Sequence, residues 1–522
     1  MTLLLGLDIG STSIKANIYD LGGNLLASGS QPTILSYPDK DNPTWSVWEP
    51  EIIWKSVKDS ITLSLKELKK LGTEKNIEKK VKAIAVTGFG MDGVPIDKNG
   101  KWLYPLISWH CPRTELQCKQ WSQKVGQDKI FFISGKQVMH IDTVYRILWM
   151  KENHPEILRK TYKWLLIEDY INFLLCGEIA TDYSMASCTS LFDQKQLNWS
   201  DELLSEFEID KSILPSPYRA GTVLGNILPR ISQEIGLSSE VKVVLGGHDY
   251  HCGAIAVGAF TPEIVMDING TWEMVFQSTI EPKLEPQVFK NGISVESHVA
   301  KNVYNIVAYS VSGLIYEWLI KTLCVEEQLE SKNNKISVWE IIKKKASSAP
   351  VGSNCIFFAP YLAGAGSPHF DNKSMGAFVG LKNNSDKTSL IRSVIEGLNY
   401  QFKDMVSAFE NASNLSPEKI IGAGGATQNE FWMQNKADIT GKLIEVPKVE
   451  EATPLGAAIL AGIGINVYSN EKEACQKTYK IGLTYEPNFK NKNAYDEYYP
   501  IFKKLYTNLK ELNIEIYEKF RK

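Results

Sequence analysis

Residues 7–20, LDIGSTSIKANIYD, decide how the first part of this chain folds. They follow a short run of Leu that is typical of a buried strand, and they turn at once to an aspartate, a glycine and three hydroxyl residues. From Ser13 to Tyr19 apolar and polar residues alternate, which is the period of a strand and not of a helix. The stretch therefore predicts a tight loop between two antiparallel strands, with Asp8 directly before the loop.

The hydroxyl-rich loop after Asp8 fits two interpretations at this point. Backbone N–H groups and hydroxyls gathered in a turn can bind phosphate, but Gly and Ser also favour a plain hairpin turn. The GxxxxGK(S/T) pattern of a Walker-type phosphate loop, which leads into a helix, is absent. A phosphate clamp between strands and an ordinary turn both remain open on this segment alone.

A second copy of the pattern lies half a chain later, in EIVMDINGTWEMVFQS at 263–278. Aligning Asp8 with Asp267 and Thr12 with Thr271 gives D-I-x-x-T in both copies. Each copy has an apolar strand before it and an alternating strand after it. A repeat on this scale predicts two similar domains that face one nucleotide.

Length and charge agree with two domains and exclude some partners. The chain has 522 residues, more than a single core usually serves, and we place the boundary so that the domains are 1–245 and 246–522. The formal net charge is −3 and no basic block is present. We therefore expect neither nucleic acid nor a membrane surface as a partner.

Cysteine usage and the apolar runs suggest where the protein works. The eight cysteines are scattered without a CxxC pair, which is typical of free thiols in a reducing compartment. The apolar run before Asp8 is too short for a signal peptide, and no run reaches the roughly 18 residues of a membrane helix. We expect a cytoplasmic protein and leave a homodimer open as its assembly.

Two segments of the second half complete the outline. The polar stretch EEQLESKNNKIS at 326–337 is interpreted as a surface loop. From Tyr498 to Phe520 apolar residues recur at spacings of three and four, which predicts an amphipathic helix. Pro500 is expected in or near the first turn of that helix.

The segment GAGGATQNE at 422–430 admits two functional interpretations and one structural one. It resembles a dinucleotide fingerprint with Glu445 about twenty residues on, which would indicate a nicotinamide-dependent dehydrogenase. A glycine turn before a helix serves equally well as a flat platform for a nucleotide base or ribose. A purely structural strand-to-helix turn is the third interpretation.

The segment GGHDYHCGA at 246–254 places Asp249 between a strand and a helix. A carboxylate at that point can accept a proton from a substrate hydroxyl, whereas the same position also suits a helix-capping Asp. A metal site made of His248, Asp249 and His251 is disfavoured, because adjacent residues on a tight turn rarely converge on one ion.

In their order along the chain, these motifs resemble the FGGY family of carbohydrate kinases. The resemblance covers nearly the whole chain, and the ordered set is far more specific than any single motif. The matching segments are GLDIGSTSIKA (6–16), PTWSVWEPEIIW (43–54), GFGMDGVPIDKNGKWLYPLISWHCPRT (88–114), TDYSMASCTSLFD (181–193), GGHDYHCGAIAVGAF (246–260), NGTWEM (269–274), FFAPYLAGAGSPHFD (357–371), SVIEGLNYQF (393–402), GAGGATQNEFWMQNKADITGKLIEVP (422–447) and EEATPLGAAILAG (450–462).

The resemblance implies an α/β fold with two actin-like (ribonuclease-H-like) ATPase domains around a deep cleft. It implies ATP and Mg²⁺ as cofactors, with the sugar mainly on the first domain and ATP mainly on the second. Asp249 would be the general base and Asp8 would orient Mg²⁺. Residues expected to hold ATP are Gly10, Ser11, Thr12, Lys15, Gly270, Thr271, Gly424, Gly425, Ala426 and Asn429. Residues expected at the sugar are Met91, Asp92, Trp109, Arg113 and Asp249.

The sugar-facing segments depart from the commoner members of the family. GFGMDG stands where many members carry Gln-Met-His-Gly, so Asp92 takes the place of His. An ionised Asp92 in the cleft would repel a substrate carboxylate, so we rank neutral ketopentoses such as xylulose, then polyols, above aldonates such as gluconate. A kinase of an aldonate, a deoxysugar or another polyol, and a sugar-independent actin-like ATPase, are the alternatives.

Overall fold

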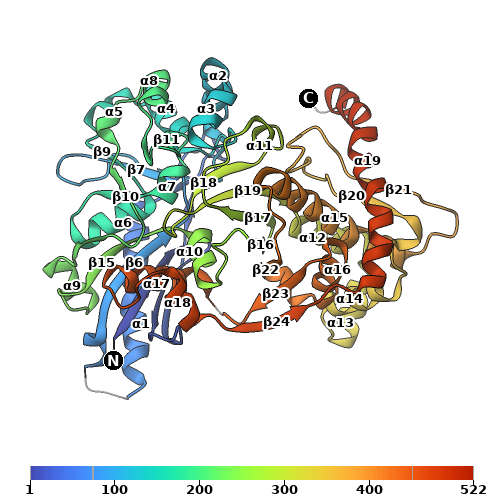
Figure 1. Cartoon of the computed structure of the whole chain (residues 1–522). Coiled ribbons are helices and arrows are strands. Elements are labelled where there is room, and N and C mark those ends of the chain that lie inside the picture. Colours follow the sequence, from blue (N-terminus) through green and yellow to red (C-terminus); the bar gives the residue numbers. More distant parts are fainter. Residues whose placement is uncertain (1, 73–75, 450, 521–522) are drawn as a thin grey trace.

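In the computed structural model the chain forms two α/β lobes, each built around one β-sheet (Figure 1). The structure describes residues 2–72, 76–449 and 451–520. The first residue of the motif at 450–462 therefore lies outside the described residues. The two lobes confirm the predicted α/β class.

The first sheet contains the loop with which the sequence opens. β1 pairs antiparallel with β2 and parallel with β6, and only Gly10, Ser11 and Thr12 lie between β1 and β2. The predicted strand–loop–strand unit is confirmed. In spatial order the strands are β14 (Val223–Asn226), β15 (Lys242–His248), β6 (Val81–Gly88), β1 (Leu3–Ile9), β2 (Ser13–Tyr19) and β3 (Leu25–Pro32).

The second sheet repeats this pairing. β16 pairs antiparallel with β17 and parallel with β22, as β1 does with β2 and β6. The repeat predicted from D-I-x-x-T is thus a repeat of topology as well as of sequence. In spatial order the strands are β18 (Ser294–Ser297), β19 (Tyr304–Val311), β17 (Trp272–Thr279), β16 (Ile264–Asn269), β22 (Lys419–Ala423), β23 (Leu443–Pro447) and β24 (Ile481–Tyr485).

Two helices, α10 (Asp249–Ala256) and α17 (Ala452–Gly464), join the lobes. α17 follows β23 in the sequence but packs on the first sheet and against α10 (Figure 1). A Cβ at Gly456 would lie 1.8 Å from the carbonyl oxygen of Cys252, so the two helices touch through their backbones. The division at residue 245 stays a prediction: β15, which contains that residue, belongs to the first sheet and leads into α10.

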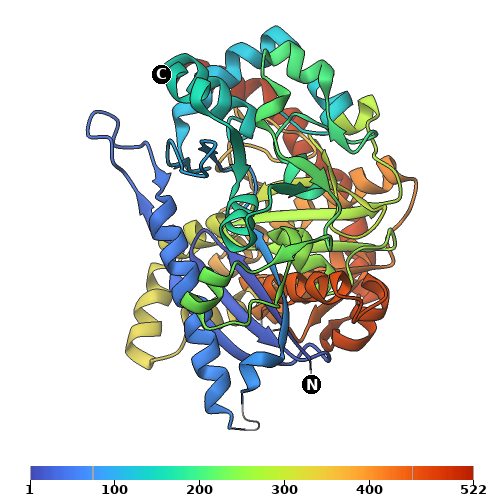
Figure 2. The same cartoon turned by 90° about the vertical axis from the view of Figure 1, so that its left-hand side faces the viewer.

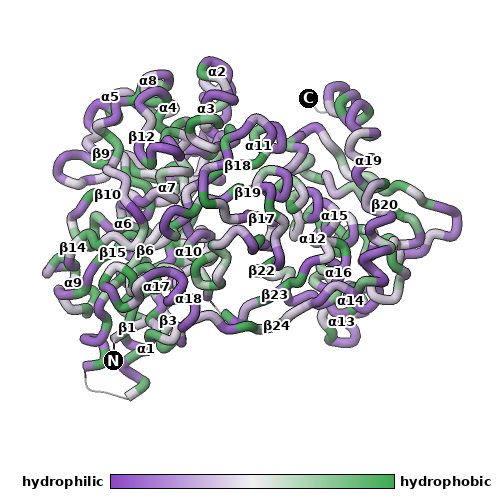
Figure 3. Tube along the Cα trace, in the orientation of Figure 1, coloured by the Kyte–Doolittle hydropathy of each residue, from purple (hydrophilic) through white to green (hydrophobic). Residues whose placement is uncertain are grey.

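Longer helices cover the sheets from outside. In the first lobe α1 (Pro50–Lys70) packs on β2 and β3, and the chain before it projects from that lobe (Figure 2). The second lobe carries α12 (Gly313–Leu323), α14 (Val338–Ser348), α15 (Lys387–Ser413) and α16 (Glu430–Thr440). Figure 3 shows hydrophobic residues along the strands and hydrophilic ones mostly at the periphery. Within the described residues, no helix combines the length and apolar character needed to cross a membrane.

Two expectations for the second half need correction. The stretch 326–337 is largely helical, because α13 (Val325–Asn334) runs through it; its polar composition reflects exposure, not the absence of a helix. The amphipathic C-terminal helix is confirmed as α19 (Phe489–Phe520), but Pro500 lies inside it and not near its start. Phe520 is 78% exposed, so the predicted apolar stripe leaves the core before the helix ends.

Candidate active site

Three parallel strands bring the predicted catalytic segments to one edge of the first sheet. β6 lies between β1 and β15, and Gly88 pairs with both Ile9 and His248. The three strands therefore end level with one another, as is usual where α/β sheets bind ligands. Asp8 lies near the end of β1, the turn with Met91 follows β6, and Asp249 follows β15.

Asp249 is oriented by two donors that share one of its oxygens. The Tyr250 N–H donates to Oδ1 at 2.6 Å, and His248 Nδ1 lies 2.7 Å from the same atom. His248 Nε2 accepts from the Gly90 N–H at 3.2 Å, which leaves Nδ1 as the protonated nitrogen facing Asp249. The Asp249 side chain is 34% exposed, and its Oδ2 receives no hydrogen bond from the described residues. This oxygen can accept a proton from a bound hydroxyl.

Asp8 has the properties of a cation ligand. Burial and then the negative charge of Asp249 raise the pKa of Asp8 well above its ordinary value, with Lys15 opposing them. Its Oδ1 is buried without a hydrogen-bond partner. A divalent cation would satisfy that oxygen and offset the repulsion between the two carboxylates. No cluster of three His, Cys, Asp or Glu side chains suited to a metal occurs in the part of the chain that the structure describes. The orphaned Oδ1 of Asp8 fits Mg²⁺, which is commonly held by one or two carboxylates and by substrate oxygens.

The loop after Asp8 requires its glycine and is braced at both sides. A Cβ at Gly10 would lie 2.8 Å from the carbonyl oxygen of Ser13, to which the Gly10 N–H donates. Lys15 lies on β2 with its Nζ 2.8 Å from both carboxylate oxygens of Glu451, the residue before α17. The predicted phosphate-binding Lys is thus held beside the loop by an acidic residue that the sequence argument missed.

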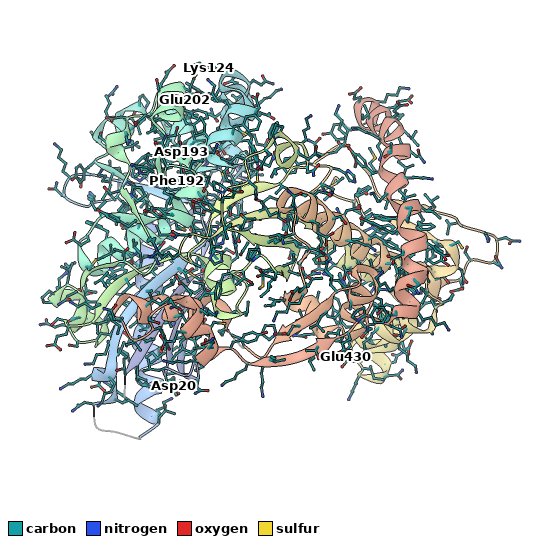
Figure 4. All side chains as sticks on the ribbon, in the orientation of Figure 1. Asp20, Lys124, Phe192, Asp193, Glu202 and Glu430 are labelled. Carbon is teal, nitrogen blue, oxygen red and sulfur yellow. The ribbon has the colours of Figure 1, made fainter. Side chains whose placement is uncertain are left out.

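A cavity of about 490 Å³ lies in the second lobe. Its lining comes from the ends of β16 and β22 and from α12, α14 and α16, all in the second lobe, whereas the Asp8 loop belongs to the first sheet. Figure 4 labels one residue from each lobe, Asp20 after β2 and Glu430 at the start of α16. Five residues predicted to bind ATP line the cavity, and they are Gly270, Thr271, Gly425, Ala426 and Asn429.

Gly424, predicted with the same group, lies where the two glycine loops meet, and its contact with ATP stays a prediction. Its φ is +91°, and a Cβ there would lie 2.4 Å from the carbonyl oxygen of Asn269. Gly424 therefore lets the two glycine loops approach each other. Across the cavity the rings of Tyr316 and Trp339 stack at 4.7 Å, a flat aromatic surface suited to a nucleotide base. Neither ring was predicted from the sequence; Trp339 lies directly after the segment that was interpreted as a loop.

Asp92 is placed differently from the expectation. It is fully buried, and three donors reach its two oxygens: Trp48 Nε1 at 2.7 Å and the Trp109 N–H at 3.0 Å on Oδ2, and Arg146 Nη2 at 2.8 Å on Oδ1. Burial raises the pKa of Asp92 to about 6, against the effects of Arg146 and the other donors. Because Arg146 compensates the charge of an ionised Asp92, the argument that Asp92 repels aldonates loses its basis. Direct contact with a sugar stays a prediction.

Met91 forms the tip of the turn that carries Asp92. Its φ is +61°, a strained value for a residue other than glycine and one that often marks functional sites. The Asp92 N–H donates to the Gly90 carbonyl at 2.7 Å, and Thr143 Oγ1 donates to the Met91 carbonyl at 2.7 Å, so the strained turn is fixed. Met91 is partly exposed, and its neighbour Gly90 bonds to His248, the residue before Asp249; contact of Met91 with the sugar stays a prediction.

Trp109 and Arg113 have different surroundings. Trp109 is half-buried and stacks on His110 at 3.7 Å. The guanidinium of Arg113 lies 4.7 Å from the Trp45 ring and 5.1 Å from the Trp149 ring, and it donates to protein groups from Nε and both Nη atoms. The structure thus gives Arg113 a packing role, and its predicted contact with the sugar stays a prediction.

The site therefore places two carboxylates, Asp249 with an oxygen free of hydrogen bonds and the buried Asp8, on one lobe and a cavity of about 490 Å³ on the other, an arrangement that fits a phosphotransferase of the actin-like class. The N-terminal domain model of the FGGY family of carbohydrate kinases matches residues 3–256, and the C-terminal domain model matches 266–465. The chain belongs to this family and is a carbohydrate kinase. This family match overturns the dehydrogenase alternative. Glu445, the acidic residue that the alternative required, is buried with its Oε2 3.1 Å from Lys419 Nζ.

Relatives within the family span the whole chain. A xylulose kinase of Staphylococcus epidermidis is 29% identical over 515 residues, with 98% of each chain covered. An L-fuculokinase of Escherichia coli is 27% identical over 493 residues, covering 93% of this chain and 98% of the relative. The crystal structure of gluconate kinase from Lactobacillus acidophilus superposes with a TM-score of 0.87 at 24% identity, covering 97% and 98%. This last likeness confirms the fold.

Proposed function

We propose that the protein transfers the γ-phosphoryl group of ATP to a hydroxyl of a small ketose. Among the candidate substrates we rank a ketopentose such as xylulose first. The observation that carries the proposal is Asp249, whose Oδ1 is held by two donors while Oδ2 is left for an acceptor hydroxyl. The relatives named xylulose kinase and L-fuculokinase support a ketose. Because Arg146 compensates the charge of Asp92, the same site also admits other acceptors. The alternative is therefore a kinase of an aldonate, a deoxysugar or a polyol.

The residues divide the work of an in-line transfer, which depends mainly on positioning and charge neutralisation. Asp249 accepts the proton of the attacking hydroxyl through Oδ2, while the Met91 turn lies beside that hydroxyl. Asp8 would hold Mg²⁺, which when bound supplies neutralisation of the phosphate charge. Lys15, Ser11 and Thr12 hold the transferring group from the first lobe, and Gly270 and Thr271 from the second. Closure of the lobes excludes water, which competes as an acceptor.

An ADP-release assay screened over ketoses, polyols and aldonates tests this function. We expect ATP consumption that depends on the added sugar and is fastest with a ketose. Sugar-independent turnover would support the actin-like ATPase instead. Faster phosphorylation of gluconate than of every ketose and polyol tested would overturn the ranking while leaving the kinase class intact.

The Gly425→Val substitution tests the nucleotide side. A Cβ at Gly425 meets nothing within 4 Å, and the residue borders the cavity, so the variant should fold while its side chain occupies space needed by the nucleotide. We expect the Kd for ATP, measured by calorimetry, to rise about tenfold or more, which is roughly 1.4 kcal/mol. Sugar binding measured without nucleotide should be unchanged. An unaltered ATP affinity in the folded variant would count against this cavity as the adenosine site.

A further inference from the structure

A buried ion pair joins the two lobes next to α10. Lys136 lies between α3 (Gln127–Ser134) and α4 (Thr143–Asn153) in the first lobe, and Glu296 lies on β18 in the second. Lys136 Nζ is 2.9 Å from Glu296 Oε1, and the side chains are 0% and 1% exposed. The desolvation cost of such a pair often cancels its attraction, so stability alone does not account for its presence.

The backbone around Lys136 is bonded to the same edge strand. The Val295 N–H donates to the Gly135 carbonyl at 2.7 Å, and the Gln137 N–H donates to Ser294 Oγ at 3.2 Å. β18 is the outermost strand of the second sheet. The first-lobe segment and this strand therefore form one unit, and Glu296 projects from it toward α10.

The second oxygen of Glu296 binds the first turn of α10. Glu296 Oε2 accepts from the Tyr250 hydroxyl and lies 3.3 Å from His251 Nε2. Asn305 Nδ2 donates to His251 Nδ1 at 2.9 Å, which places the imidazole proton on Nε2, facing Glu296. Burial lowers the pKa of His251, in agreement with this neutral form. The carboxylate thus receives donors from Lys136, Tyr250 and His251.

Tyr250 carries this contact on to Asp249. Its backbone N–H is one of the two donors on Asp249 Oδ1. Its ring lies 4.2 Å from the ring of His248, which is the other donor. Fixing the Tyr250 side chain therefore fixes both groups that orient Asp249.

We propose that Glu296, anchored by Lys136, is a positioning residue that acts through Tyr250 to direct Asp249 Oδ2 at the acceptor hydroxyl. The inference rests on the proposed function, because it needs Asp249 as the general base. Misplacing a reacting group by about 1 Å can cost about 10²-fold in rate. The ion pair joins the two lobes and is linked through Tyr250 to Asp249. Loss of the pair would therefore allow the Asp249 carboxylate to shift.

Glu296→Gln and Tyr250→Phe are the direct tests in the full-length enzyme. Phe keeps the ring against His248 and loses only the hydroxyl that reaches Glu296, so this variant is the one expected to fold without difficulty. We expect kcat to fall about 10-fold to 100-fold in both variants. The KM for ATP should stay within about twofold, because the cavity for the nucleotide lies elsewhere.

A double-mutant cycle and a control variant at a distant ion pair distinguish an effect on the positioning of Asp249 from an effect on the stability of the protein. Lys136→Met leaves Glu296 buried without its cation, whereas Lys136→Met combined with Glu296→Gln removes both charges. We expect the double variant to recover thermal stability relative to Lys136→Met while kcat stays low. Arg392→Met breaks the buried pair with Glu396 within α15, at 2.7 Å, and should lower stability without lowering kcat at temperatures where it is folded.

The outcomes distinguish this inference from the proposed function. Wild-type kcat in Tyr250→Phe and Glu296→Gln, with turnover lost in Asp249→Asn, would overturn the positioning role and leave Asp249 as the base. Wild-type kcat in Asp249→Asn itself would overturn the proposed function and this inference with it. A kcat loss in Arg392→Met equal to that in Glu296→Gln would also overturn the positioning role, because it would show a general response to lost stability.

Discussion

Replacing Asp249 with Asn is expected to lower turnover by about 10²-fold to 10⁴-fold, the range expected when the proposed general base is removed. Asn preserves the shape of the side chain, and its carbonyl oxygen can take the place of Oδ1 between His248 and Tyr250. What it loses is an oxygen able to accept a proton. Steady-state kinetics with saturating sugar should show the fall in kcat, and the affinity for ATP should change little.

Asp386→Asn is the matched control, because it shows how the same substitution behaves at an aspartate that only caps a helix. Asp386 caps α15, accepting from the Ser389 N–H at 2.8 Å, far along the chain from the site. Because Asn caps helices about as well as Asp, that variant should keep both stability and turnover. If Asp249→Asn behaved like Asp386→Asn, Asp249 would be only a helix-terminal residue and the catalytic assignment would be wrong.

Local patterns in the sequence were enough to predict the parts of the site that depend on strand ends. Alternation after Ser13 and the repeat at Asp267 predicted two strand–loop–strand units, and both are present. Asp8 and Asp249 lie at the same edge of the first sheet because β1, β6 and β15 end level in this structure. The glycines at 424 and 425 were predicted as one group, and only the structure separates the loop contact at Gly424 from the cavity lining at Gly425.

Contacts between distant segments could not be predicted in this way. The charge of Asp92 is compensated by Arg146, 54 positions away, and no periodicity links the two. Arg113 has the residue type of a substrate ligand, yet Trp45 and Trp149 enclose it. The interpretation of 326–337 as a loop was wrong, because an exposed helix and a loop have similar compositions.

The two copies of D-I-x-x-T show most clearly what tertiary contacts add. In both copies the aspartate Oδ1 is buried without a hydrogen-bond partner, but Asp8 forms no ion pair with the described residues. Its counterpart Asp267 is bonded to Lys436 Nζ at 2.5 Å, and Glu273 lies 2.6 Å from the same Nζ. Lys436 is fully buried on α16. A protein cation thus occupies the second copy, and this difference supports the first copy, Asp8, as the one proposed to hold Mg²⁺.

Replacing Lys436 with Met therefore lowers the free energy of unfolding by about 3–5 kcal/mol at pH 8, because two carboxylates stay buried without their cation. Burial already raises the pKa of Asp267 to about 7, with Lys436 opposing it. When the pKa of a carboxyl group is higher in the folded state than in the unfolded state, its contribution to stability is fully present below the unfolded-state pKa, which is about 4 for Asp. That contribution is lost as the pH rises through the folded-state pKa. Without Lys436 the folded pKa rises further, so the loss of stability should be smaller at pH 5 than at pH 8.

Denaturant unfolding of the wild type and the variant at both pH values measures this difference. Lys477→Met is the matched control, since Lys477 pairs with Glu473 at 2.6 Å on an exposed helix face and should contribute less than about 1 kcal/mol. A loss equal to that of the control, or one that does not shrink at pH 5, would show that Asp267 is not held by the buried charge. The second copy would then have a free carboxylate like Asp8, and the asymmetry that assigns Mg²⁺ to the first lobe would lose its physical basis.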